Sequence, residues 1–169
     1  AHRKDDPNYF NNLANVLLAR GQPEQALDTY KAARDLNPDH IESLMGGGSL
    51  LFAMGRLEEA EDLFRKILVL DPHHHAAVNN LGVILARTGR PAEAVIVFRT
   101  VIHDADAAAE LFSNLARALE MQNELANARD MVSRALAKDA DLISARLVHC
   151  HLLRREGSLT DARAAYEKL

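Results

Sequence analysis

Apolar residues recur along this chain at spacings of three and four, which is the pattern of helices that bury one face. Between His75 and Ala108, a first apolar stripe is broken at Gly89-Arg90-Pro91 and a second stripe then runs to Ile102. Glycine suits the residue that ends a helix, and proline suits the first residue of the next one. The pattern predicts two helices of about 14 residues each, joined by a tight turn into an antiparallel hairpin.

The same pattern returns every 34 residues without insertion or deletion. Alanine keeps this period at Ala26, Ala60, Ala94, Ala128 and Ala162, and leucine keeps it at Leu17, Leu51, Leu85, Leu119 and Leu153. Small residues recur at Ala14, Gly48, Gly82, Ala116 and Cys150, and large ones recur at Tyr30, Phe64, Phe98, Val132 and Tyr166. A strict period of this length indicates a repeat array. We expect the small positions to let helices approach and the large ones to fill the space between hairpins.

The predicted fold class is all-α: an α-α superhelix, a right-handed solenoid of five tandem helix-turn-helix repeats. We expect one array over residues 7–169, with repeats at 7–40, 41–74, 75–108 and 109–142 and a truncated repeat at 143–169. Residues 1–6 are expected to form an N-terminal extension. The chain opens on Ala1 rather than Met and stops at Leu169 within a helical pattern, which indicates a fragment of a larger protein.

This repeat resembles the tetratricopeptide repeat, whose pattern runs from an aromatic residue through Leu-Gly and Tyr to Ala, Phe and Pro. The match is carried by Phe10-Leu13-Ala14-Leu17, Ala26-Tyr30 and Pro38, and again by Val78-Leu81-Gly82-Leu85 and Ala94-Phe98. The signature tryptophan is absent, and Arg146 stands where a large apolar residue is usual. The resemblance implies a bacterial-type protein-interaction scaffold, not an enzyme, whose first helices line a concave groove that holds a peptide or protein segment.

Helical phase assigns a set of first-helix residues to that groove. The predicted peptide-binding residues are Asn11, Asn12, Asn15, Met45, Ser49, Asn79, Asn80, Arg87, Asn114, Arg117, His151 and Arg154. The same phase includes Asn8, Glu42, Gly46, Phe52, Val83, Glu110, Ser113, Met121, Ser144, Leu147 and Val148. Asn12, Asn80 and Asn114 share one position of the repeat. A carboxamide both donates and accepts, so such a row suits the main chain of an extended peptide. It resembles the asparagine ladder of O-GlcNAc transferases; the alternative is that these asparagines support contacts between helices.

Chaperone-binding relatives hold a peptide's terminal carboxylate with a clamp of Lys, Arg and Asn. The matching positions here are Asn11, Asn15, Gly46, Ala76 and Asn80, without lysine or arginine. Because a carboxylate grip depends on fixed positive charge, we do not expect a clamp of this kind.

Three consecutive glycines, Gly46-Gly47-Gly48, lie inside a predicted helix. Each internal glycine costs about 1 kcal/mol relative to alanine. Gly48 is the periodic small residue, whereas the bare backbone at Gly46 is interpreted as room for a close-lying ligand.

Composition narrows the range of partners. With 48% hydrophobic and 26% charged residues, the chain is expected to fold. Its net charge of -4, without a basic stripe, argues against nucleic-acid binding. No apolar run approaches the roughly 20 residues that span a bilayer, so we expect no membrane insertion.

No residues suggest catalysis or a cofactor, and neither is predicted. The His73-His74-His75 run raises the question of a metal, but no metal site is predicted. This run falls at a turn between repeats, where consecutive side chains point in different directions. Cys150, the single cysteine, occupies a small packing position and is expected to be a buried, inert thiol.

Two further roles stay open besides the scaffold. One is the substrate-recruiting arm of a larger enzyme, such as an O-GlcNAc-transferase-like glycosyltransferase. The other is a self-assembling array that associates through uncapped ends. A single cysteine favours a reducing compartment, which predicts the cytoplasm, and the periplasm remains an alternative for a fragment.

Overall fold

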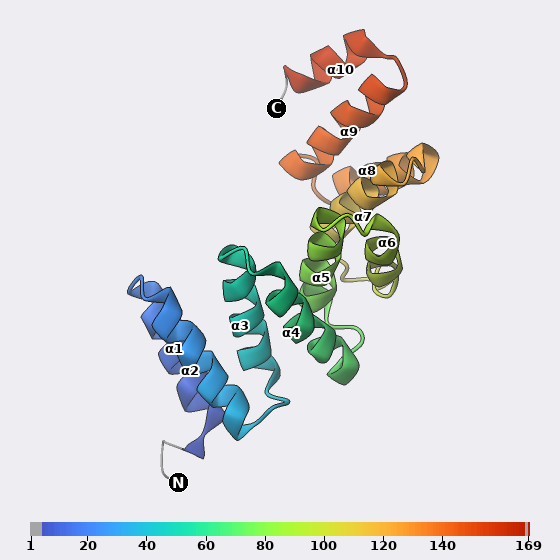
Figure 1. Ribbon diagram of the computed structural model, residues 1–169. Helices are drawn as coiled ribbons and strands as arrows, with labels where there is room; N and C mark the ends of the chain where they lie inside the picture. Colours follow the sequence, from blue (N-terminus) through green and yellow to red (C-terminus); the bar gives the residue numbers. More distant parts are fainter. Residues whose placement is uncertain (1–4, 168) are drawn as a thin grey trace. The chain divides into compact units, whose positions relative to one another are not determined.

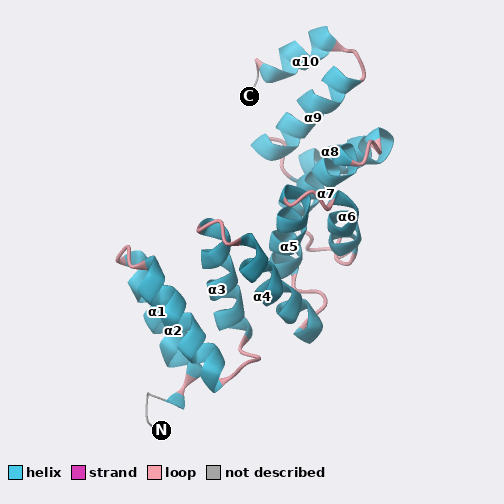
Figure 2. Cartoon of the chain, viewed as in Figure 1, coloured by secondary structure: helices cyan, strands magenta, loops and turns pink. Residues whose placement is uncertain are grey.

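The computed structural model describes residues 5–167 and 169, and it arranges them as helices joined by short turns (Figures 1 and 2). Ten helices follow one another in the described residues: α1 (Pro7–Ala19), α2 (Pro23–Leu36), α3 (Ile41–Ala53), α4 (Leu57–Leu70), α5 (His75–Arg87), α6 (Pro91–Arg99), α7 (Ala109–Met121), α8 (Leu125–Lys138), α9 (Ile143–Arg155) and α10 (Leu159–Tyr166). Helices α1 and α2, α3 and α4, α7 and α8, and α9 and α10 pack as hairpins. The all-α prediction is confirmed.

The turn inside each hairpin is closed by the same backbone hydrogen bond. One residue of each turn has positive φ, at Gly21, Gly55, Gly89, Asn123 and Gly157. Glycine and asparagine tolerate this left-handed conformation better than other residues. The next amide then donates, at 2.8 to 3.0 Å, to the carbonyl of the periodic leucine, at Leu17, Leu51, Leu85, Leu119 and Leu153. This is the bond of a Schellman helix end, and it fixes where each first helix stops.

The periodic small residues are buried, as predicted. Ala26, Ala60, Ala94 and Ala128 are wholly buried, and Ala162 is 4% exposed. The large residues Tyr30, Phe64, Phe98 and Val132 are buried as well, but Tyr166 is 38% exposed. The expectation that Tyr166 fills a gap between hairpins is therefore wrong. Its ring instead lies at the surface, 6.3 Å from the ring of His151.

Rings of the second helices lie directly against glycines of the first helices. A Cβ atom on Gly48 would come within 3.0 Å of the Phe64 ring, and one on Gly82 within 2.3 Å of the Phe98 ring. The small residue therefore permits the close approach, and the ring fills the space that it leaves.

Gly46 is also a packing position. A Cβ atom there would lie 2.4 Å from the Tyr30 ring, and Tyr30 is 1% exposed. The Tyr30 hydroxyl passes this glycine and donates to Oδ1 of Asn15 on α1, while burial raises the pKa of that hydroxyl. The interpretation of Gly46 as room for a ligand is wrong, because a side chain from α2 already occupies the space.

The second helix of the third hairpin is shorter than predicted. Helix α6 has 9 residues and ends at Arg99, although the apolar stripe continues to Ile102. The Thr100 hydroxyl donates to the Val97 carbonyl at 2.8 Å, and the Thr100 and Val101 amides form bonds that span three residues instead of four. Such side-chain bonds compete with the helix. Val101 and Ile102 stay buried, so the stripe predicted burial correctly and the helix end wrongly.

The chain divides within α5 into two compact units, the first ending at Asn80 and the second beginning at Leu81. The first unit has a cluster of Ala14, Ala26, Tyr30 and Leu50 at its core. The single array over 7–169 stays a prediction. Of the predicted extension over 1–6, residues 1–4 lie outside the described residues.

The neighbouring glycines of α3 allow a paired test of close packing. Gly46→Ala adds a methyl group against the buried Tyr30 ring and should cost about 1–3 kcal/mol through overpacking. At Gly47 the nearest atom is Nη1 at the far end of the long Arg34 side chain, whose hydrogen bond to the Ser43 carbonyl is long at 3.4 Å, so the side chain is able to move. Gly47→Ala should therefore leave stability unchanged or raise it by up to about 1 kcal/mol through helix propensity. Urea midpoints measured by circular dichroism distinguish the variants, and equal midpoints would contradict the packing account.

Candidate functional site

The predicted groove residues all keep access to solvent on the first helices. The exposed ones are Asn12, Asn15, Ser49, Arg87, Arg117 and Arg154, and the half-buried ones are Asn11, Met45, Asn79, Asn80, Asn114 and His151. Two residues of the same helical phase are not available at the surface. Ser113 is 1% exposed and donates from its hydroxyl to that of Ser144 on α9 at 2.9 Å, and Val148 is 4% exposed. They were misplaced because α7 and α9 pack against each other there.

In the second unit, three of the predicted residues line one cavity of about 440 Å³. Its lining residues are Val83, Ala86, Arg87, Asn114, Arg117 and Met121. Those from α7 are spaced by three and four, so they share one helix face. The sequence predicted Arg87, Asn114 and Arg117 for this site and placed Val83 and Met121 on the same side. It missed Ala86, whose small side chain gives no signal of its own.

This cavity combines positive charge with an apolar wall. Arg87 and Arg117 are exposed, and none of the described residues that line the cavity carries a carboxylate. Met121, 49% exposed, contributes apolar surface together with Val83 and Ala86. Ligand sites commonly join such walls to a few polar groups that fix orientation.

The acid nearest to this wall in sequence is directed toward α9. The Glu120 carboxylate lies 4.0 Å from Nδ1 of His151, and its side chain is 15% exposed. The Glu120 carbonyl accepts a hydrogen bond from Arg155 at 2.8 Å. Glu120 therefore supports the contact between α7 and α9 and does not line the cavity.

In the first unit, some of the asparagines serve contacts between helices. The Oδ1 atom of Asn15 accepts a hydrogen bond from the Tyr30 hydroxyl on α2. His40, 8% exposed, connects α1 to the start of α3. Its Nδ1 lies 2.7 Å from the Ser43 hydroxyl and its Nε2 lies 3.2 Å from Oδ1 of Asn8. Asn12, by contrast, is exposed, and its side chain makes no hydrogen bond within the described part of the chain. The two interpretations of the asparagines therefore apply to different residues.

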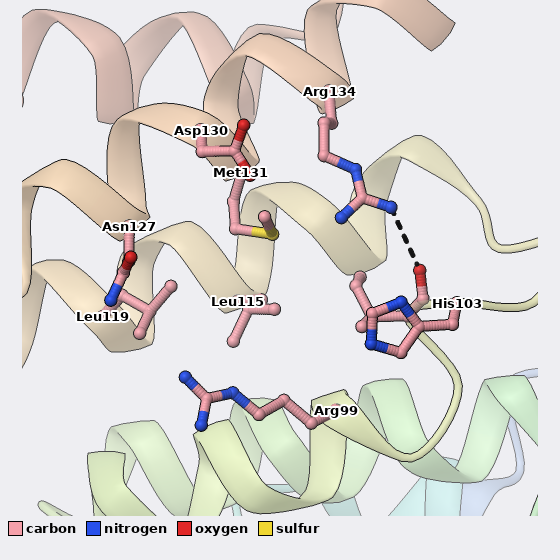
Figure 3. Close-up of a pocket in the computed structure, with 9 residues that line it drawn as sticks. Arg99, His103, Leu115, Leu119, Asn127, Asp130, Met131 and Arg134 are labelled. Atoms are coloured by element: carbon pink, nitrogen blue, oxygen red, sulfur yellow. Dashed lines mark hydrogen bonds between the residues drawn. The ribbon is translucent and has the colours of Figure 1, made fainter.

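A second pocket of the second unit, of about 190 Å³, lies where α6 ends early (Figure 3). Leu115, Leu119 and Met131 contribute apolar groups, whereas Arg99 and Asp130 bring charges of both signs. Arg134 donates to the Ile102 carbonyl at 3.3 Å and lies 4.4 Å from the centre of the Phe112 ring. The hydrophobic pattern gave no sign of this pocket, because it predicted an uninterrupted helix.

The histidine run at the start of α5 contains a helix cap. His74 Nδ1 accepts the Ala77 amide at 3.2 Å, as His40 Nδ1 accepts the Ser43 amide at 3.3 Å one repeat earlier. These bonds satisfy amides that the first helical turn leaves without partners. The run was predicted to be polar turn residues, and at His74 the polar side chain caps the first turn of α5.

Cys150 is wholly buried, as expected for its packing position. Burial raises the pKa of its thiol, which lowers the thiolate fraction at neutral pH.

Hairpins repeated at a fixed interval, with polar residues exposed along the first helices, define a helical repeat protein. A family model described as tetratricopeptide repeat matches residues 11–75 and 46–110. The chain belongs to the tetratricopeptide repeat family.

Solved structures support the same fold. Residues 41 to the end of MamA from Desulfovibrio magneticus RS-1 match with a TM-score of 0.87 and 23% identity over 99% of this chain and 93% of that one. PilF of Pseudomonas aeruginosa matches with a TM-score of 0.81 and 22% identity, over 99% of this chain and 76% of PilF. YrrB, a tetratricopeptide repeat protein with an unusual peptide-binding site, matches with a TM-score of 0.80 and 20% identity. The match covers 98% of this chain and 85% of YrrB. At these identities the likeness establishes the fold.

The sequence matches none of the curated proteins. Among the described residues, no helix combines the length and the apolar character needed to cross a membrane.

The buried thiol gives a direct test of the register in the last hairpin. Because Cys150 is buried and its pKa is raised, iodoacetamide at pH 8 should alkylate the folded chain at least about tenfold more slowly than the urea-unfolded chain. Mass spectrometry at timed intervals measures both rates. Equal rates would show that this position is accessible and that the register of α9 is wrong.

Proposed function

We propose that this chain is a non-catalytic scaffold that binds an extended peptide or protein segment along its first helices. The observation that carries this proposal is the cavity between α5 and α7, which presents two arginines and an asparagine beside apolar side chains. A peptide main chain offers carbonyl and amide groups at regular spacing. Exposed carboxamides pair with both, and guanidinium groups bind carbonyl oxygens or carboxylates.

The asparagines of the first helices support the same proposal. Asn12, Asn80 and Asn114 occupy one repeat position and keep access to solvent in their respective units. Asn15 is exposed, and because its Oδ1 accepts the Tyr30 hydroxyl, its amide N–H groups are the donors that it would offer to a ligand. One structural relative, YrrB, is a tetratricopeptide repeat protein with a peptide-binding site, which is consistent with this use of the fold.

A triple variant tests the proposal. Peptides selected from a random library on the unmodified chain should bind Asn12→Ala/Asn80→Ala/Asn114→Ala at least about tenfold more weakly, since each lost amide pair is worth about 1 kcal/mol. Gln25→Ala/Asn127→Ala is the matched control, because both side chains are exposed on second helices. Calorimetry measures affinity, and circular dichroism verifies helicity. Undiminished binding by the folded triple variant would exclude the asparagine ladder.

Self-association is a second candidate, favoured by apolar side chains exposed at the last hairpin. Leu159 is 66% exposed, Tyr166 is 38% exposed, and a cavity of about 520 Å³ between α8, α9 and α10 contains Leu136 and Leu153. Large exposed apolar surfaces commonly mark contacts with other proteins. Sedimentation velocity should then show a larger species as concentration rises. Leu159→Glu should abolish it, and a monomer at every concentration would exclude this candidate.

A further inference from the structure

We propose that the cavity between α5 and α7 selects an acidic segment, in which a carboxylate side chain binds Arg87 and Arg117 and a neighbouring aliphatic side chain contacts Val83, Ala86 and Met121. This inference rests on the proposed function and specifies its partner. It concerns the second unit alone.

The distribution of charge supports an acidic partner. The chain as a whole is acidic, with a net charge of -4. Its predicted groove residues in the first unit nevertheless include no basic side chain, whereas those in the second unit are Arg87, Asn114, Arg117, His151 and Arg154. The basic residues among the predicted groove positions therefore all belong to the second unit. Glu110 has the same helical phase on α7, but no carboxylate lines the cavity among the described residues.

The chemistry of arginine favours a carboxylate in this setting. A guanidinium group is planar and always charged, and it binds both oxygens of a carboxylate through parallel N–H donors. Two guanidinium groups that line one cavity repel each other, and an anion between them removes that repulsion. Asn114 lines the same cavity, and a carboxamide has both donor and acceptor groups.

The apolar wall explains why an aliphatic neighbour belongs to the recognised segment. Met121 is 49% exposed in the free chain, so contact with an aliphatic side chain would remove apolar surface from water. Displaced water also strengthens the adjacent ion pairs, because the local dielectric constant falls. A volume of about 440 Å³ suits a few side chains rather than a folded domain.

Other features of the molecule fit an anionic partner less well. The pocket where α6 ends is lined by both Asp130 and Arg99, so its charges do not favour one sign. The cavity between α2 and α4 is lined by Glu24, Asp28, Asp35 and Glu59 together with basic residues. Nucleic acid is disfavoured at the α5 and α7 cavity, because no aromatic side chain lines it for base stacking.

The test uses a defined peptide and a charge reversal. The probe is a fluorescein-labelled peptide, Gly-Glu-Leu-Glu-Leu-Glu-Gly, and its comparators replace each Glu by Gln or by Lys. Fluorescence anisotropy should give a dissociation constant at least tenfold lower for the Glu peptide than for the Gln peptide, with a steep loss at high salt. Arg117→Glu should weaken the Glu peptide at least tenfold and strengthen the Lys peptide.

Arg99→Glu is the matched control, since it makes the same charge change at an exposed residue that does not line this cavity. This variant should bind the Glu peptide and the Lys peptide with affinities within about twofold of those of the unmodified chain. Three outcomes would overturn the inference: equal binding of the Glu and Gln peptides, no effect of Arg117→Glu in a folded chain, or no binding of the Glu peptide at all. If selected neutral peptides still require Asn12, Asn80 and Asn114 in these cases, the proposed function stands and only the acidic preference fails.

Discussion

Close contact between a ring and a glycine backbone fixes the geometry within the second and third hairpins. Phe64 lies against Gly48 and Phe98 lies against Gly82, so closely that a Cβ atom on Gly48 would crowd its ring and one on Gly82 would overlap with its ring. Each pair sets how near two helices come and how the first helix is rotated about its axis. That rotation places one face of the first helix in the core and the opposite face in water. The candidate site depends on this constraint at α5, because one wall of the cavity lies on the solvent face of that helix.

Much of the fold was predictable because the same small residue is buried at the same position of every repeat. Burial of Ala26, Ala60, Ala94 and Ala128 followed directly from the 34-residue period. The early end of α6 was not predictable in this way. Hydrophobic periodicity reports which residues are buried, and Val101 and Ile102 are buried without being helical. At the helix end the Thr100 hydroxyl donates to the Val97 carbonyl, a local hydrogen bond that an apolar pattern does not record.

The candidate site was predictable as a face but not as a cavity. Helical phase identified Arg87, Asn114 and Arg117 as surface residues, and the structure brings them to one cavity. Phase also placed Ser113 on that surface, where α9 covers it. It also predicted that a ligand lies against Gly46, although the Tyr30 ring fills the space beside that residue. Both errors have the same origin: the phase of one helix carries no information on what a neighbouring helix contributes.

The solvent face of the first helices is the proposed peptide-binding surface. Arginine side chains lie on both sides of the hairpins and therefore report where a ligand docks. NMR spectra of the arginine Nε–Hε groups, recorded during titration with the Glu peptide, test this claim most directly. The account predicts that the signals of Arg87 and Arg117 shift and saturate together, while those of Arg99 and Arg129 stay in place. Saturating shifts at Arg99 or Arg129, with Arg87 and Arg117 unmoved, would contradict it.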